Sequence, residues 1–248
     1  MSERHRLRSI LALVQLNGLI PIRSQPLYLL SILSSPLSFL FFIYIASHGT
    51  YFAFGVTGGM VLTMLSIGTG LQGDLTHYRN DLKFQDVVVA SPVEAPSYIF
   101  GMALSELVYS APGLAVFVVL WAIGGWATLP GAGVLVGTLL LVWGFATALS
   151  FTLATYFSDV RETWMYSPLI SLGLSVIPPV YYPISALPGW AQSLAYLSPT
   201  TYAGQLVQAA SGLVPLSATH SAVDWLVLLG FTVALFLVAA TRAHWRDP

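Results

Sequence analysis

The sequence predicts an all-α integral membrane protein with six transmembrane helices, organised as one domain over residues 1–248. Hydrophobic residues make up 56% of the chain and charged residues only 8%, against about 25% charged in ordinary soluble domains. Mean hydropathy is +0.77. Six apolar runs approach or exceed the roughly 20 residues that cross a bilayer. So few charges cannot cover a soluble globule of this size, and little chain remains for a soluble catalytic domain.

The six predicted spans are residues 27–47, 51–71, 98–125, 131–156, 164–182 and 222–241. Basic residues orient them. All nine fall on one side of the six-span model: Arg4, Arg6, Arg8, Arg23, Arg79, Lys83, Arg161, Arg242 and Arg246. The connections 48–50, 126–130 and 183–221 contain no lysine or arginine. This segregation predicts a multi-pass protein of the cell membrane with both termini in the cytoplasm.

Residues 1–25, before the first span, are predicted to form a helix that lies in the cytoplasmic interface. Leu7, Ile10, Leu11 and Val14 share one helical face, and Arg4 and Arg8 lie on another, as in interfacial amphipathic helices. The alternative is a signal peptide, because basic residues precede apolar ones. Gln15 and Asn17 interrupt the apolar run, however, and no small-residue cleavage site follows.

The predicted cytoplasmic loop 72–97 contains a short apolar cluster among its charges. Phe84, Val87 and Val88 would share one face of a short helix that ends at Pro92. A solvated loop is the alternative. The run of three valines favours a partner that covers it.

The segment 183–221 follows the fifth span and is too broken by proline and glycine to cross the membrane. Its Trp190, Tyr196 and Tyr202 are typical of membrane interfaces. We expect it to dip into the outer leaflet and return, shielded by protein. Pro178 and Pro179 would break the fifth span and redirect the chain, although an ordinary helix end is the alternative.

The sequence lacks the residues and motifs that several kinds of functional site require. The chain contains no cysteine, no phosphate-binding G-x-x-x-x-G-K-[ST] motif, no H-x-x-x-H spacing and no basic patch, so we expect no catalytic, metal, cofactor or nucleic-acid site. Glu106 is the exception that needs an explanation, because a carboxylate inside a span is costly. Either Glu106 lines a polar vestibule, or the third span starts later and Glu106 lies at the cytoplasmic interface.

The order of these parts resembles the membrane subunit of ABC-2 type exporters, over nearly the whole chain. In the first loop, that family has an acid, aliphatic residues, then Ser or Thr and Pro, as in Asp86-Val-Val-Val-Ala-Ser91-Pro92. The Thr-Leu that usually precedes the acid is Phe84-Gln85 here. After the fifth span, the family pattern matches Pro179-Val-Tyr181-Tyr182-Pro183 and Leu187-Pro188-Gly189-Trp190, and later Ser198-Pro199.

The resemblance implies roles for these residues. Phe84, Asp86, Val87, Val88, Ser91 and Pro92 would form a coupling helix on which a separate cytoplasmic ATPase subunit docks, with ATP bound to that partner. A second permease subunit would complete the membrane dimer, in contact with membrane lipids. The chemistry of the residues themselves adds a gate or translocation path, which would involve Glu106, Pro179, Tyr181, Tyr182, Pro183 and Trp190.

The resemblance leaves the substrate open. Arg23 and Pro26 before the first span are similar to drug and lipid exporters, whereas Phe157-Ser-Asp-Val-Arg161 is similar to polysaccharide and teichoic-acid exporters. We favour drugs or other amphipathic molecules. A secondary carrier or a non-transporting scaffold is the alternative of a different class. A carrier would be expected to show inverted repeats and midplane charges, and neither is evident.

Overall fold

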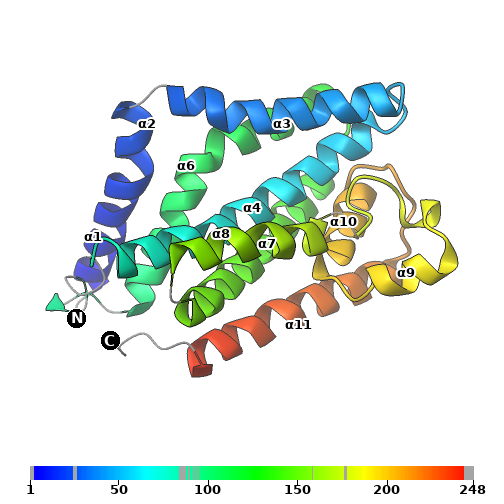
Figure 1. The fold of residues 1–248 in the computed structure, drawn as a ribbon. Helices are drawn as coiled ribbons and strands as arrows, with labels where there is room; N and C mark the ends of the chain where they lie inside the picture. The colour runs from blue at the N-terminus through cyan, green and yellow to red at the C-terminus, as the bar shows by residue number, and fades with distance from the viewer. Residues whose placement is uncertain are drawn as a thin grey trace.

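The computed structural model describes residues 3–24, 27–83, 88, 90, 91, 93, 95–157, 159–175 and 178–242. Helices are the only regular elements within these ranges. The long helices are α3 (Leu27–Ala46), α4 (Phe52–Asn80), α6 (Ala95–Ile123), α7 (Leu129–Tyr156), α8 (Val160–Ser175) and α11 (Ala218–Arg242). In Figure 1, α4, α7, α8 and α11 run along one common direction, whereas the first part of α6 rises beside the N-terminal helix. The start of α1 and the end of α11 lie at the same end of the bundle. The predicted all-α membrane class is confirmed.

Four helices within the described residues are long and apolar enough to cross a membrane: Phe52–Asn80, Ser97–Ile123, Leu129–Tyr156 and Ala218–Thr241. They match the second, third, fourth and sixth predicted spans. The helix α3 coincides with the first predicted span, and α8 covers much of the fifth. The count of six spans therefore stays a prediction.

Helices enter the predicted loop 72–97 from both sides. The helix α4 continues to Asn80, and α6 begins at Ala95. The extension of α4 is helical because it still has an interior to pack against: Leu75 and Thr76 are both buried. The predicted span ends at residue 71 because the polar residues that follow lower the mean hydropathy of the segment. The helix itself continues beyond that point.

The helix α4 is the centre of the bundle, because most of its apolar stretch is buried inside the protein. Val56, Met60 and Leu65 pack in one core with residues of α6, α7 and α11. At Gly68 the helix crosses α7 so closely that an added Cβ would overlap Ala146. Small residues permit such close helix approach in membrane proteins.

A second core lies at the end of the bundle that holds the termini. Its buried residues come from six parts of the chain and include Leu13, Leu71, Leu75, Val88, Tyr98, Met102, Phe151 and Ala239.

The N-terminal segment is one continuous helix of three parts: α1 (Glu3–Leu13), a π-helical turn η1 (Val14–Leu19) and α2 (Ile20–Ser24). In Figure 1 it stands across the direction of the long helices. Leu13 and Val14 are buried against the bundle, whereas Leu7 and Leu11 are 60% and 63% exposed. An apolar exposed face is what an interfacial helix presents to lipid, although its position in the interface stays a prediction.

The segment between α8 and α11 lies at the opposite end of the bundle (Figure 1). It contains a 3₁₀ turn η2 (Ile184–Ala186) and the helices α9 (Gly189–Ala195) and α10 (Pro199–Ala210). None of these pieces is long enough to cross a membrane. Whether the segment enters the outer leaflet stays a prediction.

Candidate functional site

A polar cleft of about 550 Å³ opens between α4 and α8. The α4 side supplies hydroxyl groups, a carboxyl group and an imidazole, and the α8 side supplies further hydroxyls. The lining residues are Ser66, Thr69, Gly70, Gly73, Asp74, His77, Val160, Thr163, Ser167 and Pro168. The glycines leave room, because a Cβ on Gly73 would meet nothing within 4 Å. The lining thus combines polar side chains with apolar surface, and such a cleft between apolar helices can hold water or the polar part of a solute.

Glu106 lies directly behind this cleft. Its carboxyl group is close enough to that of Asp74 for the two to interact electrostatically, and a Cβ on Gly70 would be 3.6 Å from Glu106 Oε2. Two neighbouring carboxylates repel each other when both are charged, so the charge on one is coupled to the charge on the other. Glu106 is therefore not isolated, and it lies within the stretch Ser97–Ile123 that is long enough to span.

Asn17 in the π-helical turn joins the N-terminal helix to α4 and α6. Tyr78 on α4 donates a hydrogen bond from its hydroxyl to Asn17 Oδ1 at 3.0 Å. Asn17 Nδ2 in turn lies 3.2 Å from the sulfur of Met102 on α6. Short π-helical turns are frequent at functional sites, because they displace a side chain from the regular helical register.

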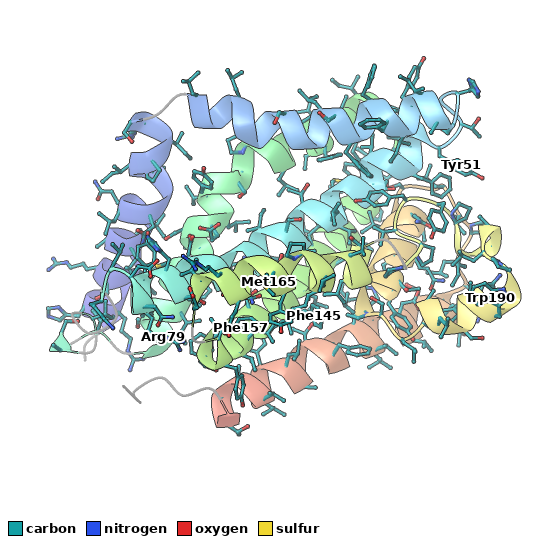
Figure 2. All side chains as sticks on the ribbon, viewed as in Figure 1. Tyr51, Arg79, Phe145, Phe157, Met165 and Trp190 are labelled. Atoms are coloured by element: carbon teal, nitrogen blue, oxygen red, sulfur yellow. The ribbon has the colours of Figure 1, made fainter. Side chains whose placement is uncertain are left out.

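The turn between α7 and α8 is fastened to the end of α4. Arg79 donates hydrogen bonds to the backbone carbonyls of Phe157 and Thr155, and the Phe157 ring stacks on Tyr166 with centroids 5.5 Å apart. Figure 2 shows Arg79 and Phe157 close together at the end of the bundle that holds the termini. This attachment sets the start of α8 and hence the width of the cleft at that end.

At the other end, the chain break after α8 is held by one buried side chain. Gln208 of α10 is 2% exposed, and its amide nitrogen lies 3.1 Å from the carbonyls of Pro179 and Val180 and 3.3 Å from that of Tyr182. A Cβ on Gly58 of α4 would overlap the Val180 carbonyl. The break is thus packed between α4 and α10 rather than being a loose helix end.

The predicted gate residues do not form one cluster. Tyr181 packs on Phe39 of α3, with ring centroids 4.3 Å apart, and Pro179 is buried. Tyr182 and Pro183 are half-buried beside them. Trp190 is 72% exposed on α9, and Figure 2 places it at the outer tip of the bundle, away from Arg79 and Phe157. Glu106 and this segment lie toward opposite ends of the structure.

The predicted coupling residues are only partly within the described residues. Val88 is 6% exposed and packs in the core near the termini, so within this chain it contacts its own helices. Ser91 is half-buried and donates to the Val88 carbonyl at 2.7 Å. Phe84, Asp86, Val87 and Pro92 lie outside the described residues. Contact of these six residues with an ATPase stays a prediction.

The family model of the ABC-2 type transporter matches residues 9–211, which is most of the chain. The chain belongs to the ABC-2 type transporter family. The match extends from the N-terminal helix through α10 and includes the cleft, Glu106 and the Gln208 attachment. No curated protein matches the chain significantly. This ABC-2 type permease is a multi-pass membrane protein and a transport subunit rather than a catalytic one, and its family implies an ATPase partner.

Sequence patterns did not reveal several residues of the permease's site. Asp74, Asn17 and Tyr78 match no motif. Gln208 is one of three glutamines in the largely apolar segment 183–221, and nothing in the pattern distinguishes it from the other two. A signal was nevertheless present: Gln208 is a long polar side chain one helical turn after Gly204, which packs against the same break. Buried polar side chains in membrane proteins need partners, so this position was a candidate for an internal hydrogen bond.

Proposed function

We propose that this chain is the membrane subunit of an ATP-driven exporter that moves drugs or other amphipathic molecules out of the cell. The observation that carries this proposal is the polar cleft between α4 and α8 in a member of the ABC-2 type transporter family. The cleft offers polar contacts beside apolar helices, and an amphipathic solute needs both.

In this proposal, ATP binds to the separate cytoplasmic ATPase subunit. Two permease subunits form the membrane dimer, and one ATPase docks on each loop that contains residues 84–92. The support is the family match and the absence of a phosphate-binding motif from the sequence. Both termini lie in the cytoplasm, as the placement of the basic residues predicts.

Charge in the cleft favours cationic or neutral substrates over polyanions. Its described lining includes the carboxyl group of Asp74 and contains no lysine or arginine. A phosphate-rich polymer would meet repulsion there, whereas a cation would be attracted. The polysaccharide or teichoic-acid alternative is supported only by the Phe157-Ser-Asp-Val-Arg161 stretch.

The gate in this proposal is the segment Pro179–Pro183 at the outer end. Tyrosine rings combine an apolar body with a polar tip, which suits a closure that excludes water and yields to amphipathic solutes. The support is the tight packing of the break against Gly58 and its attachment to Gln208. The alternative role of Tyr181, Tyr182 and Trp190 is anchoring in the membrane interface.

Asp74→Asn tests the substrate class. We expect ATP-driven transport of a permanently cationic dye to fall about tenfold, because a favourable charge interaction of about 1.4 kcal/mol corresponds to that factor. Transport of a neutral amphipathic dye should change little. Initial rates in vesicles containing the permease and its ATPase measure both.

Asp159→Asn is the matched control, because Asp159 is exposed and lies outside the lining of the cleft. It makes the same change of carboxylate to amide, and an asparagine can still accept the bond from the Arg161 backbone N–H. Equal losses for both dyes in Asp74→Asn, or an equal loss of cation transport in Asp159→Asn, would contradict the role of Asp74 in selectivity.

A further inference from the structure

A second, apolar groove of about 760 Å³ opens between α1, α6, α7 and α11. Its lining comes from the beginning of α6 and from the later turns of α7 and α11. These parts of the helices lie at the end of the bundle that holds both termini (Figure 1). The groove shares no lining residue with the cleft between α4 and α8, so it is a separate feature of the protein.

Side-chain size explains why a groove exists at this place. Ala103, Gly144 and Ala148 form a floor of small residues between α6 and α7. Aromatic residues form the walls: Phe100 and Trp143 meet edge to face with centroids 6.2 Å apart. The volume is within the range of about 300–1,000 Å³ that is typical of ligand pockets. The groove is therefore large enough for an extended apolar chain.

One charged residue lies in the described lining of the groove, Arg6 of α1. Arg6 is exposed, and it is contributed by the helix whose exposed leucines predict a position in the membrane interface. A cation beside an apolar groove complements a molecule with a hydrocarbon chain and an anionic head. Basic pockets between membrane helices on the cytoplasmic side bind anionic lipid head groups.

We propose that this groove binds one anionic phospholipid, with an acyl chain against the small-residue floor and the phosphate beside Arg6. The bound lipid bridges α1 and α11. Binding at this place does not depend on ATP, on the ATPase partner or on the transported substrate, so it is tested separately from the proposed function.

Quenching of Trp143 by brominated lipid tests the proposal. The full chain is reconstituted in phosphatidylcholine bilayers that contain a rising mole fraction of dibrominated phosphatidylglycerol, or of dibrominated phosphatidylcholine for comparison. Bromine quenches tryptophan on contact, and the difference between the wild type and Trp143→Phe isolates the signal of Trp143. We expect half-quenching of this signal at a several-fold lower mole fraction of the brominated anionic lipid than of the brominated zwitterionic lipid.

Two variants test the contact with the lipid head group and the contact with the acyl chain separately, and a third variant is the control. Arg6→Gln should abolish the preference for the anionic lipid, whereas Arg8→Gln should keep it, because Arg8 lies on the same exposed helix but not in the lining of the groove. Ala240→Leu adds volume at an exposed lining position and should raise the half-quenching fraction of both lipids.

Four outcomes would overturn the proposal. The first is equal quenching by the two lipids in the wild type. The second is an anionic preference that survives Arg6→Gln. The third is that Trp143 resists quenching by both lipids in the full chain but is quenched when residues 243–248 are deleted. The occupant of the groove would then be the chain's own C-terminus. The fourth is displacement of the brominated lipid by inorganic phosphate at millimolar concentration, since the site would then recognise phosphate alone rather than a lipid.

Discussion

Gln208 connects α10 to the chain break after α8 through a single side chain. Replacement by leucine keeps the volume but removes the donor, which leaves the buried carbonyls of Pro179 and Val180 without this partner. Unsatisfied buried groups cost about 1–3 kcal/mol each. We expect Gln208→Leu to lower the melting temperature of the purified protein by roughly 4–8 °C, for a loss of about 2 kcal/mol.

Gln205→Leu is the control for this prediction. Gln205 is half-buried on the same helix, and its amide reaches only the Tyr196 hydroxyl at 3.4 Å. Its melting temperature should stay within about 2 °C of the wild type, since partly exposed substitutions change stability by about 0.5 kcal/mol or less. Identical melting curves for Gln208→Leu and the wild type would show that the break is held by other contacts.

The sequence identified Glu106 as a carboxylate inside a predicted span, where a charge is costly. The structure places it close to Asp74 and Gly70. Which residues share a site depends on how each helix is rotated and where it crosses its neighbours, and hydropathy contains neither quantity. Asp74 was expected in a cytoplasmic loop, and no functional role was expected for Tyr78 or Asn17. The apolar appearance of Val88 was correctly noted, but an apolar residue in a charged loop fits either a partner or the chain's own core. Within this chain Val88 packs in the core near the termini, and its contact with an ATPase stays a prediction.

At the scale of elements, the crossing of α4 and α7 depends on Gly68. An alanine there would overlap Ala146, and its Cβ would also be 3.0 Å from the backbone of Thr147, which cannot move aside as a side chain can. Overpacking of this kind costs about 1–3 kcal/mol. We expect Gly68→Ala to lower the melting temperature and to reduce the yield of folded protein in detergent.

Gly73→Ala is the matched control on the same helix. Its Cβ would meet nothing within 4 Å, and glycine inside a helix is destabilising by roughly 0.5–1 kcal/mol relative to alanine. Gly73→Ala should therefore melt at the same temperature as the wild type or slightly higher. If the two variants lose stability equally, the close approach at Gly68 is not what determines the effect.

Long, strongly apolar helices were predictable, and their ends and interruptions were less so. The spans corresponding to α4, α6, α7 and α11 follow directly from hydropathy, because each is a long run of apolar residues. The extension of α4 to Asn80 and the π-helical turn at Val14–Leu19 depend on tertiary contacts. The Gln208 attachment joins residues that are distant in the sequence, and local patterns do not contain such information.

For the whole molecule, the placement of the nine basic residues makes a prediction about topology. Reporter fusions at His48, Thr128 and Gly212 should indicate the outside of the cell, and a fusion at Lys83 should indicate the inside. The start of α1 and the end of α11 lie at one end of the bundle in Figure 1, as they would with both termini on one side of the membrane. An outside signal at Lys83 would reverse the assignment of the cytoplasmic side.

The function proposed for this permease is transport of amphipathic solutes with energy from an ATPase partner. The most direct measurement is uptake of a cationic dye into inside-out vesicles that contain the permease and the ATPase, with and without ATP. We predict uptake that requires ATP and is lost when the ATPase carries a substituted P-loop lysine. Val87→Asp in the predicted docking loop should reduce uptake while the chain stays inserted. Uptake that proceeds without ATP, or that follows an ion gradient alone, would contradict the account and indicate a secondary carrier.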